Sequence, residues 1–244
     1  MIPATNNTYN NMLAFERNLA TQIESFTNGL LPPLCALIVE YTSTPLKAAA
    51  AVQKLRDELV DKSKDVQRLD CLDSQFQKFQ SELTIAPETL TVLALHQDLI
   101  DSLDLHDIPL NPTMLQQLAQ ACPNVRDLNV SNCRLSAYTE TEASAEAIVN
   151  HLPAIAHFTK LVTLDLSNNV IFADEDPSDL LALTTLKDLR LLKLYNTNIY
   201  PCDFCHIQNL QEALPELVFE IDNTTFQRIK EKFPDDVQKA AAGL

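Results

Sequence analysis

One segment has the residue types and spacing of a chemical site, Cys202-Asp-Phe-Cys205-His206. The pattern C-x-x-C-H attaches c-type haem, and C-x-x-C alone serves as a redox pair or as half of a zinc site. Haem attachment needs an export route and a distal axial ligand, and zinc needs further ligands. The sequence contains no second C-x-x-C and no H-x-x-x-H. We therefore interpret the pair as structural, expect no metal and no cofactor, and keep an enzyme based on Cys202, Cys205 and His206 as a third hypothesis.

The glycine content argues against common classes of enzyme. Gly29 and Gly243 are the only glycines in 244 residues. A glycine-rich phosphate loop, a dinucleotide fingerprint and a nucleophile elbow each need more than one glycine, because their backbone approaches a ligand closely or turns with positive φ. The histidines are scattered, and no His, Cys and Asp spacing resembles a catalytic triad. We expect the protein not to be an enzyme.

The charge is strongly acidic and unevenly distributed. The chain has 18 basic and 33 acidic residues, a formal net charge of −15. Residues 1–84 carry 8 basic and 10 acidic side chains, whereas residues 85–244 carry 10 and 23. A phosphate backbone is repelled by such a field, so we expect no nucleic-acid partner. The acidic part favours a basic protein partner, and a solvated, solubilising surface is the alternative.

The sequence gives no sign of a membrane segment. The first residues lack the basic start and apolar stretch of a signal peptide, and the most apolar window, from Leu30, is short and holds two prolines. Six cysteines without a signal sequence are typical of reduced thiols. We predict a cytoplasmic protein, and export into a host cell without a cleaved signal is an alternative. The sequence does not specify an oligomeric state.

The N-terminal third has helical spacing. Residues 11–28 place apolar side chains on one helical face, a double proline follows, and a short apolar helix is expected over residues 34–41. Within residues 45–83 the apolar positions fit a heptad that starts at Val52, with three misses. This pattern fits either a short coiled coil or two helices packed on one domain. We favour two helices, because a turn-like stretch at residues 70–74 interrupts the run.

A leucine pattern recurs after residue 100. Four segments match L-x-x-L-x-L-x-x-N-x-L, and their central leucines are 25, 36 and 28 residues apart. Two of these separations are typical of leucine-rich repeats, and the third implies an insertion, residues 134–160. A degenerate fifth copy lies near residues 215–223, and a similar run from Leu90 is predicted to be a helix that begins at Pro87. The central leucines are Leu103, Leu128, Leu164 and Leu192.

Each copy predicts a short strand with two inward leucines, followed by a helix. The ninth position of each copy turns inward and satisfies backbone groups of the curve. It is occupied by Ile108, Cys133, Asn169 and Thr197, of which the last three can form hydrogen bonds. The first copy is therefore predicted to cap the array, and Cys133 is interpreted as a structural residue, not a nucleophile.

Helix starts follow two of the predicted strands. Asn111-Pro112 and Asp176-Pro177 each combine an N-cap residue with proline at the first helical position. A further helix over residues 224–233 is expected to cover the last strand.

The residues between the inward leucines point to the other face of the predicted sheet. One row contains Asp104, Asn129, Asp165 and Lys193, so carboxylates recur along one surface. A preformed acidic sheet suits a basic helix or loop, and a merely solvated polar face is the alternative. The residues predicted to bind a partner are Asp104, His106, Asp127, Asn129, Asp165, Lys193 and Tyr195.

The segments LNVSNCRL, MLQQLAQACPNV and LVTLDLSNNVI resemble leucine-rich repeats of the ribonuclease-inhibitor and cysteine-containing kinds. The resemblance covers about residues 100–222. It implies an α/β fold, a short solenoid with parallel strands on its concave face and helices on its convex face. We expect residues 1–90 to form a helical region that caps a repeat domain over residues 91–244.

The segment at residues 31–59 resembles an F-box, which begins Leu-Pro and continues with an apolar helix and a Val-x-x-x-Trp segment. The tryptophan position falls at Leu55 or Arg56. F-box helices followed by such repeats form substrate adaptors of ubiquitin ligases, so the resemblance implies ligase docking. The residues carried over as docking residues are Leu31, Pro32, Leu37, Ile38 and Tyr41.

Our leading hypothesis is a non-enzymatic protein-interaction module that binds its partner on the acidic concave face. The second is an F-box-like substrate adaptor of a ubiquitin ligase, or a bacterial effector that mimics one.

Overall fold

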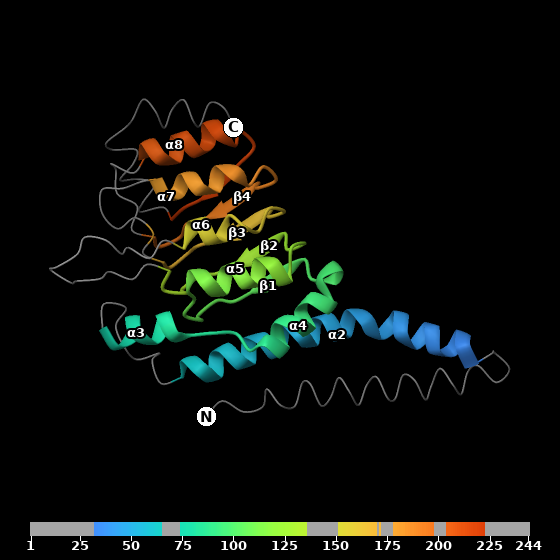
Figure 1. Ribbon diagram of the computed structural model, residues 1–244. Helices are drawn as coiled ribbons and strands as arrows, with labels where there is room; N and C mark the ends of the chain where they lie inside the picture. The colour runs from blue at the N-terminus through green and yellow to red at the C-terminus, as the bar shows by residue number, and fades with distance from the viewer. Residues whose placement is uncertain are drawn as a thin grey trace.

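A computed structural model describes residues 32–64, 74–135, 151–169, 171, 178–197 and 204–222. It has a mixed α/β architecture with a five-stranded parallel sheet (Figure 1). Residues 11–28, Asp176-Pro177, most of the 134–160 insertion and residues 224–233 lie outside this part of the chain, and so do the predictions made for them. Among the described residues, no helix has both the length and the apolar composition that a bilayer crossing requires.

The five strands follow one another in the sheet in chain order. They are β1 (Ser102–Asp104), β2 (Asp127–Asn129), β3 (Thr163–Asp165), β4 (Leu191–Lys193) and β5 (Val218–Glu220). Leu103, Leu128, Leu164 and Leu192 are paired in register, and all four are buried. The predicted strands are confirmed, and the degenerate copy near residue 218 supplies the fifth.

The helices that connect the strands lie on one side of the sheet. They are α5 (Pro112–Ala121), α6 (Leu152–Ile155), α7 (Ser178–Leu181) with the 3₁₀ turn η2 (Ala182–Thr185), and α8 (Phe204–Ala213), and Figure 1 shows them stacked in the order of the strands. The predicted start of α5 is confirmed, because Asn111 Oδ1 accepts a hydrogen bond from the Met114 backbone nitrogen at 2.8 Å. The two layers bury their leucines against each other.

The turn after each of the strands β1 to β4 adopts the left-handed backbone conformation at an Asp or Asn. Asp107, Asn132, Asn168 and Asn196 have φ between 51° and 63°. Each lies four residues after the central residue of its strand. Asn and Asp tolerate this region better than other residues with a Cβ atom. This choice explains how a chain with two glycines builds four such turns.

The helices before the sheet are α2 (Pro32–Ser63), α3 (Ser74–Glu82) and α4 (Pro87–Leu95), with a 3₁₀ turn η1 (Gln97–Leu99). The separate short helix expected over residues 34–41 is wrong, because α2 runs without a break through Pro45. Pro45 is exposed, so the backbone bond that its ring removes can be replaced by water. The helix predicted to begin at Pro87 is confirmed as α4.

The N-terminal helices share one core with the sheet. Leu55 and Leu59 of α2 are buried together with Leu93 of α4 and Leu103 of β1. Of the two explanations for the heptad pattern, the structure has two separate helices, α2 and α3, instead of one long coiled-coil helix. The heptad residues that lie on them bury against their own domain.

A buried polar contact fixes α3 to the loops that follow β1 and β2. Gln80 donates from Nε2 to the backbone oxygens of Leu110 at 2.6 Å and Arg134 at 3.0 Å. The Arg134 guanidinium lies over the ring of Phe76, 4.7 Å from its centroid. Because Gln80 is buried, these hydrogen bonds also satisfy an amide that water cannot reach.

Candidate partner-binding face

The sheet face opposite the buried leucines is defined by three rows of side chains, which we call the outer face. The middle row lies between the two inward residues of each strand, and the other rows lie two residues before and after it. All the members that the burial assignments cover are exposed or half-buried except Ser167. In strand order the rows are Ser102, Asp127, Thr163, Leu191 and Val218; Asp104, Asn129, Asp165, Lys193 and Glu220; and His106, Ser131, Ser167, Tyr195 and Asp222.

The outer face carries five carboxylates and one lysine. The strand register brings the predicted residues of the middle row into one line across β1 to β4, and Glu220 of β5 extends that line. In the middle row the carboxylates lie on every second strand, with Asn129 and Lys193 between them, so they are separated by about 9–10 Å, twice the strand spacing. The outer face therefore carries an excess of negative charge.

Three members of the middle row have a structural function that the sequence analysis missed. Asp104, Asn129 and Asp165 each accept, at Oδ1, a hydrogen bond from the backbone nitrogen two residues later. The distances for Asn129 and Asp165 are both 3.0 Å. Asp and Asn commonly cap a turn in this way. The recurrence of Asp or Asn at this position of the first three copies was the signal that could have revealed this function.

The turn after β4 is held differently. Lys193 has no acceptor atom in its side chain, so it cannot form this local hydrogen bond. The backbone nitrogen of Tyr195 donates instead to Ser167 Oγ at 3.2 Å, and that of Asn196 donates to Asp222 Oδ2 at 3.3 Å. The turn after β4 is thus stabilised by side chains that follow the neighbouring strands β3 and β5, and no local turn bond requires an acceptor at position 193.

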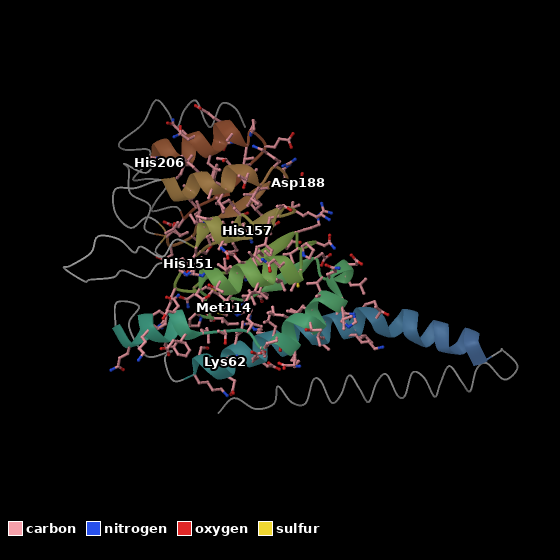
Figure 2. The ribbon with its side chains drawn as sticks, viewed as in Figure 1. Lys62, Met114, His151, His157, Asp188 and His206 are labelled. Carbon is pink, nitrogen blue, oxygen red and sulfur yellow. The ribbon has the colours of Figure 1, made fainter. Side chains whose placement is uncertain are left out.

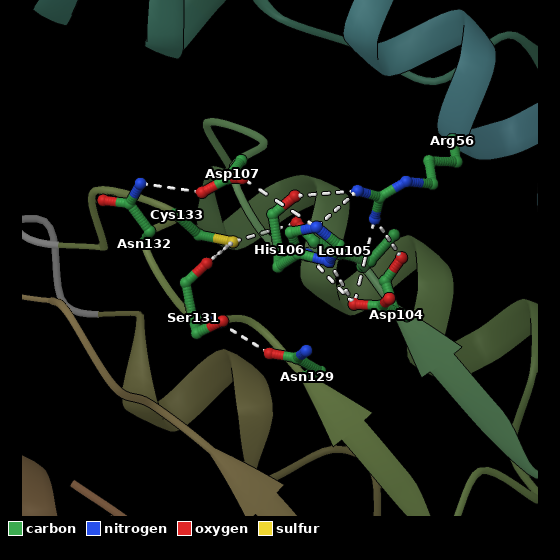
Figure 3. A network of polar contacts seen from close by, with 9 residues as sticks. All are labelled: Arg56, Asp104, Leu105, His106, Asp107, Asn129, Ser131, Asn132 and Cys133. Carbon is green, nitrogen blue, oxygen red and sulfur yellow. Dashed lines mark hydrogen bonds and ion pairs between the residues drawn. The ribbon is translucent and has the colours of Figure 1, made fainter. Parts of the chain in front are cut away.

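At the β1 end of the outer face, Arg56 of α2 contacts the first residue of the middle row, Asp104 (Figure 3). Arg56 donates from Nη1 to the backbone oxygen of Asp104 at 2.8 Å, and Nη1 lies 3.8 Å from Asp104 Oδ1. Its Nη2 lies 2.9 Å from His106 Nε2. Asp104 and His106 were predicted as partner-binding residues, and in the structure both also contact Arg56. Arg56 and Asp104 are 48 residues apart in the chain, so no local sequence pattern could have predicted their contact.

The contacts of His106 select one neutral tautomer. Arg56 can only donate, so His106 Nε2 accepts and Nδ1 carries the hydrogen that Asp104 Oδ1 accepts at 2.7 Å. Partial burial by itself would raise the pKa of the Asp104 carboxyl. The hydrogen bonds from His106 and the charge of Arg56 outweigh burial and lower that pKa. Asp104 is therefore held as a carboxylate by the protein itself.

At the opposite end, Tyr195 is 41% exposed, and its hydroxyl donates to Glu220 Oε2 at 3.1 Å. Desolvation and the Glu220 carboxylate raise the pKa of the Tyr195 phenol. Tyr195 thus stays neutral and presents an aromatic ring on the outer face.

The ninth-position residues are structural, as predicted. All four side chains are buried. Asn169 Nδ2 donates to the backbone oxygens of Val130 at 2.8 Å and Leu166 at 2.9 Å, and Thr197 Oγ1 donates to that of Leu194 at 2.9 Å.

Cys133 satisfies backbone groups in the same manner. Its Sγ donates to the Leu105 oxygen at 3.1 Å, and burial strongly raises the pKa of its thiol. Burial also raises the pKa of Cys122 to about 12. Both thiols are therefore protonated at neutral pH and unsuited to nucleophilic attack.

The residues of the C-x-x-C-H segment are only partly described. Cys202 lies outside the described part, and His206 lies on α8. Figure 2 shows His151, His157 and His206 at different heights of the stack. Within the described residues, no three His, Cys, Asp or Glu side chains are grouped so that they could hold a metal ion.

The F-box-like segment forms part of α2. Leu31 and the side chains of Pro32, Leu37, Ile38 and Tyr41 lie outside the described part, so the adaptor hypothesis stays a prediction. Leu55, one of the two positions that fall at the F-box tryptophan, is fully buried in the core of the protein itself.

Comparisons with known proteins add no assignment, because no family model matches the chain and no curated protein matches it either.

Proposed function

We propose that the protein is a non-enzymatic interaction module whose outer face binds a protein partner. In this proposal the strands and the helices between them form a short leucine-rich-repeat solenoid, and the outer face is its concave side. The observation that carries the proposal is the alignment of the middle row across five parallel strands, from Asp104 to Glu220. Such a surface is preformed, so a partner can bind without ordering it first.

The repeat interpretation is supported by residues at equivalent positions of the copies, which have the same structural roles. The central leucines are buried in register, the ninth positions are buried, and the turns use Asp or Asn with positive φ. Repeats of this kind stabilise one another through contacts between neighbours.

The binding interpretation is supported by charge that the turns do not require. Asn129 forms the same turn bond as Asp104 and Asp165 without a charge, so the turn needs an oxygen acceptor and not a carboxylate. Asp127 is exposed in the first row, where no turn bond is made. The excess of carboxylates on this face therefore calls for an explanation outside the fold.

The test removes charge while it keeps every turn bond. The double variant Asp127→Asn, Asp165→Asn is compared with Asp188→Asn, Glu212→Gln, which removes two exposed charges away from the outer face. Each protein is used as bait in affinity purification from its native cells, and the recovered partner is then titrated against both variants. We expect the first variant to weaken binding about tenfold, because two partner cations lose their counter-charges. Equal affinity for both variants would show that the partner binds elsewhere, for example on the 134–160 insertion.

A further inference from the structure

Apolar side chains gather at one end of the otherwise polar outer face. Leu191 and Val218 are partners in the parallel register of β4 and β5, and Tyr195 follows β4. Val218 is 49% exposed and Tyr195 is 41% exposed. We call these three residues the β4–β5 patch.

The fold does not require apolar residues at these places. The positions equivalent to Leu191 and Val218 are Ser102, Asp127 and Thr163 in the other strands, and those equivalent to Tyr195 include Ser131 and Ser167. Polar residues therefore meet the needs of the same strand and turn. Exposed apolar side chains that adjoin one another on a polar surface commonly mark a binding site. Tyrosine is among the residues that contribute most to such sites.

The patch has acidic neighbours. In the middle row, Asp165 precedes Lys193 and Glu220 follows it, and Glu220 accepts the hydrogen bond from the Tyr195 hydroxyl. Among the described residues, neither Asp165 nor Glu220 forms an ion pair. Both carboxylates are thus available to a cation brought by a partner.

The chain itself provides an example of how this face binds a cation. Arg56 reaches the β1 end of the middle row from a helix, α2, and contacts Asp104 and His106 (Figure 3). Figure 1 shows that α2 lies beside β1, at the end of the sheet remote from β5. The β4–β5 end offers the same row of acceptors together with apolar surface.

We propose that the β4–β5 patch is the centre of the binding face and that its occupant is a basic amphipathic helix of a protein partner. An apolar side chain of that helix packs against Leu191, Tyr195 and Val218, and an Arg or Lys one turn away pairs with Asp165 or Glu220. Lys193 lies between these carboxylates and disfavours a uniformly cationic segment. This inference rests on the proposed function and specifies its partner.

The probe is a phage-displayed library of random 16-residue peptides, selected on the full-length protein. A parallel selection uses the double variant Leu191→Thr, Val218→Thr, which makes the two strand positions of the patch polar and places at each a β-branched residue, a type favoured in strands. The matched control is Ser102→Ala, in the same row on β1. A peptide from the consensus is then titrated by fluorescence anisotropy against all three proteins.

We expect peptides enriched by the unmodified protein to combine an apolar residue with Arg or Lys at helical spacing. The consensus peptide should bind the double variant with at least about tenfold lower affinity, because an apolar contact at the centre of an interface is lost. Ser102→Ala should leave its affinity unchanged, and all three proteins should have similar thermal midpoints.

Three results would overturn the inference. They are an absence of enriched peptides, an acidic consensus, and a consensus peptide that binds the double variant with unchanged affinity. Selection that succeeds only after Phe226→Ser and Ile229→Ser would show that the chain's own segment 224–233 is the occupant, not a partner. The inference alone fails if the native partner binds the double variant Asp127→Asn, Asp165→Asn more weakly but binds the double variant Leu191→Thr, Val218→Thr with unchanged affinity. If neither variant weakens that partner, the proposed function fails as well.

Discussion

The side-chain oxygen of Asn169 accepts a hydrogen bond from the backbone nitrogen of Cys133 at 3.0 Å, although 36 residues separate the two. The same oxygen lies 3.3 Å from the Leu135 nitrogen, and Asn169 Nδ2 donates to the backbone oxygens of Val130 and Leu166, the residues directly after β2 and β3. Asn169 is buried. One side chain therefore joins the turns after β2 and β3, and its loss leaves several backbone groups without partners.

This relationship predicts a ranking of stability among ninth-position variants. Asn169→Ala should lower the free energy of unfolding by more than about 3 kcal/mol, because buried donors and acceptors lose their partners together. Thr197→Val should cost about 1 kcal/mol, because among the described residues the Thr197 hydroxyl forms one hydrogen bond, to the Leu194 oxygen. Urea unfolding followed by circular dichroism measures both values. Equal losses of stability in the two variants would contradict the inference that Asn169 joins the turns after β2 and β3.

The positive φ of Asn132, 53°, predicts an unusual order of substitutions. Ala and Gly both remove the bond from Asn132 Nδ2 to Asp107 Oδ1, so their difference isolates the backbone conformation. Asn132→Ala should be about 1–2 kcal/mol less stable than Asn132→Gly, because a Cβ atom is strained in the left-handed region.

Asn209 supplies the control for that order, because it is exposed on the helix α8. There Asn209→Ala should be more stable than Asn209→Gly by about 1 kcal/mol, which is the ordinary helical preference. The same order at both sites would refute the conformational explanation.

His151 predicts a loss of stability in acid. Its Nε2 donates to the Leu110 oxygen at 2.9 Å, and its buried Nδ1 has no hydrogen-bond partner among the described residues. Burial lowers the pKa of His151 from 6.5 to about 4. Between these two values the unfolded chain binds a proton that the folded chain does not. The contribution of neutral His151 to the free energy of unfolding is therefore fully present above about pH 6.5, and about 3 kcal/mol of it is lost as the pH approaches 4.

The measurement is the free energy of unfolding from pH 7 to pH 4 for the unmodified protein, His151→Gln and His157→Gln. His157 is exposed and serves as the matched control. The pH slope between 4 and 6.5 should become smaller in His151→Gln only. Parallel curves for all three proteins would mean that carboxylates alone cause the loss.

The Arg56 contact predicts a weak charge coupling and a stronger effect of backbone hydrogen bonds. Asp104 is 54% exposed and 3.8 Å from the guanidinium, so solvent screens the ion pair. In a double-mutant cycle of Arg56→Met and Asp104→Asn, we expect a coupling energy below about 1 kcal/mol. Arg56→Met alone should cost about 1–2 kcal/mol, because the oxygen of Asp104 loses a charged donor. A coupling above about 2 kcal/mol would show that the carboxylate dominates the contact.

Local patterns predicted the elements of the fold well. The alternation around Leu103, Leu128, Leu164 and Leu192 identified four strands and their register, because an inward leucine at every second position has one stable orientation in a sheet. Asn111-Pro112 identified a helix start for an equally local reason. The break expected before Pro45 was wrong, because an exposed proline can be accommodated within a long helix.

The candidate site was predicted less completely. The rows of the outer face followed from strand alternation, but the turn bonds of Asp104, Asn129 and Asp165 and the occupation of Asp104 by Arg56 were missed. The turn bonds depend on backbone angles. The Arg56 contact depends on where α2 packs.

The sequence by itself determined which residues lie inward and which lie outward along each strand, because that alternation is a property of two consecutive residues. Only the tertiary structure decided which outward residues stay available to a partner. Asp104 is paired with Arg56, from 48 residues earlier in the chain, whereas Asp165 and Glu220 form no ion pair among the described residues. The physical reason is distance: a strand orients its own side chains, and only the packing of remote helices determines what covers them.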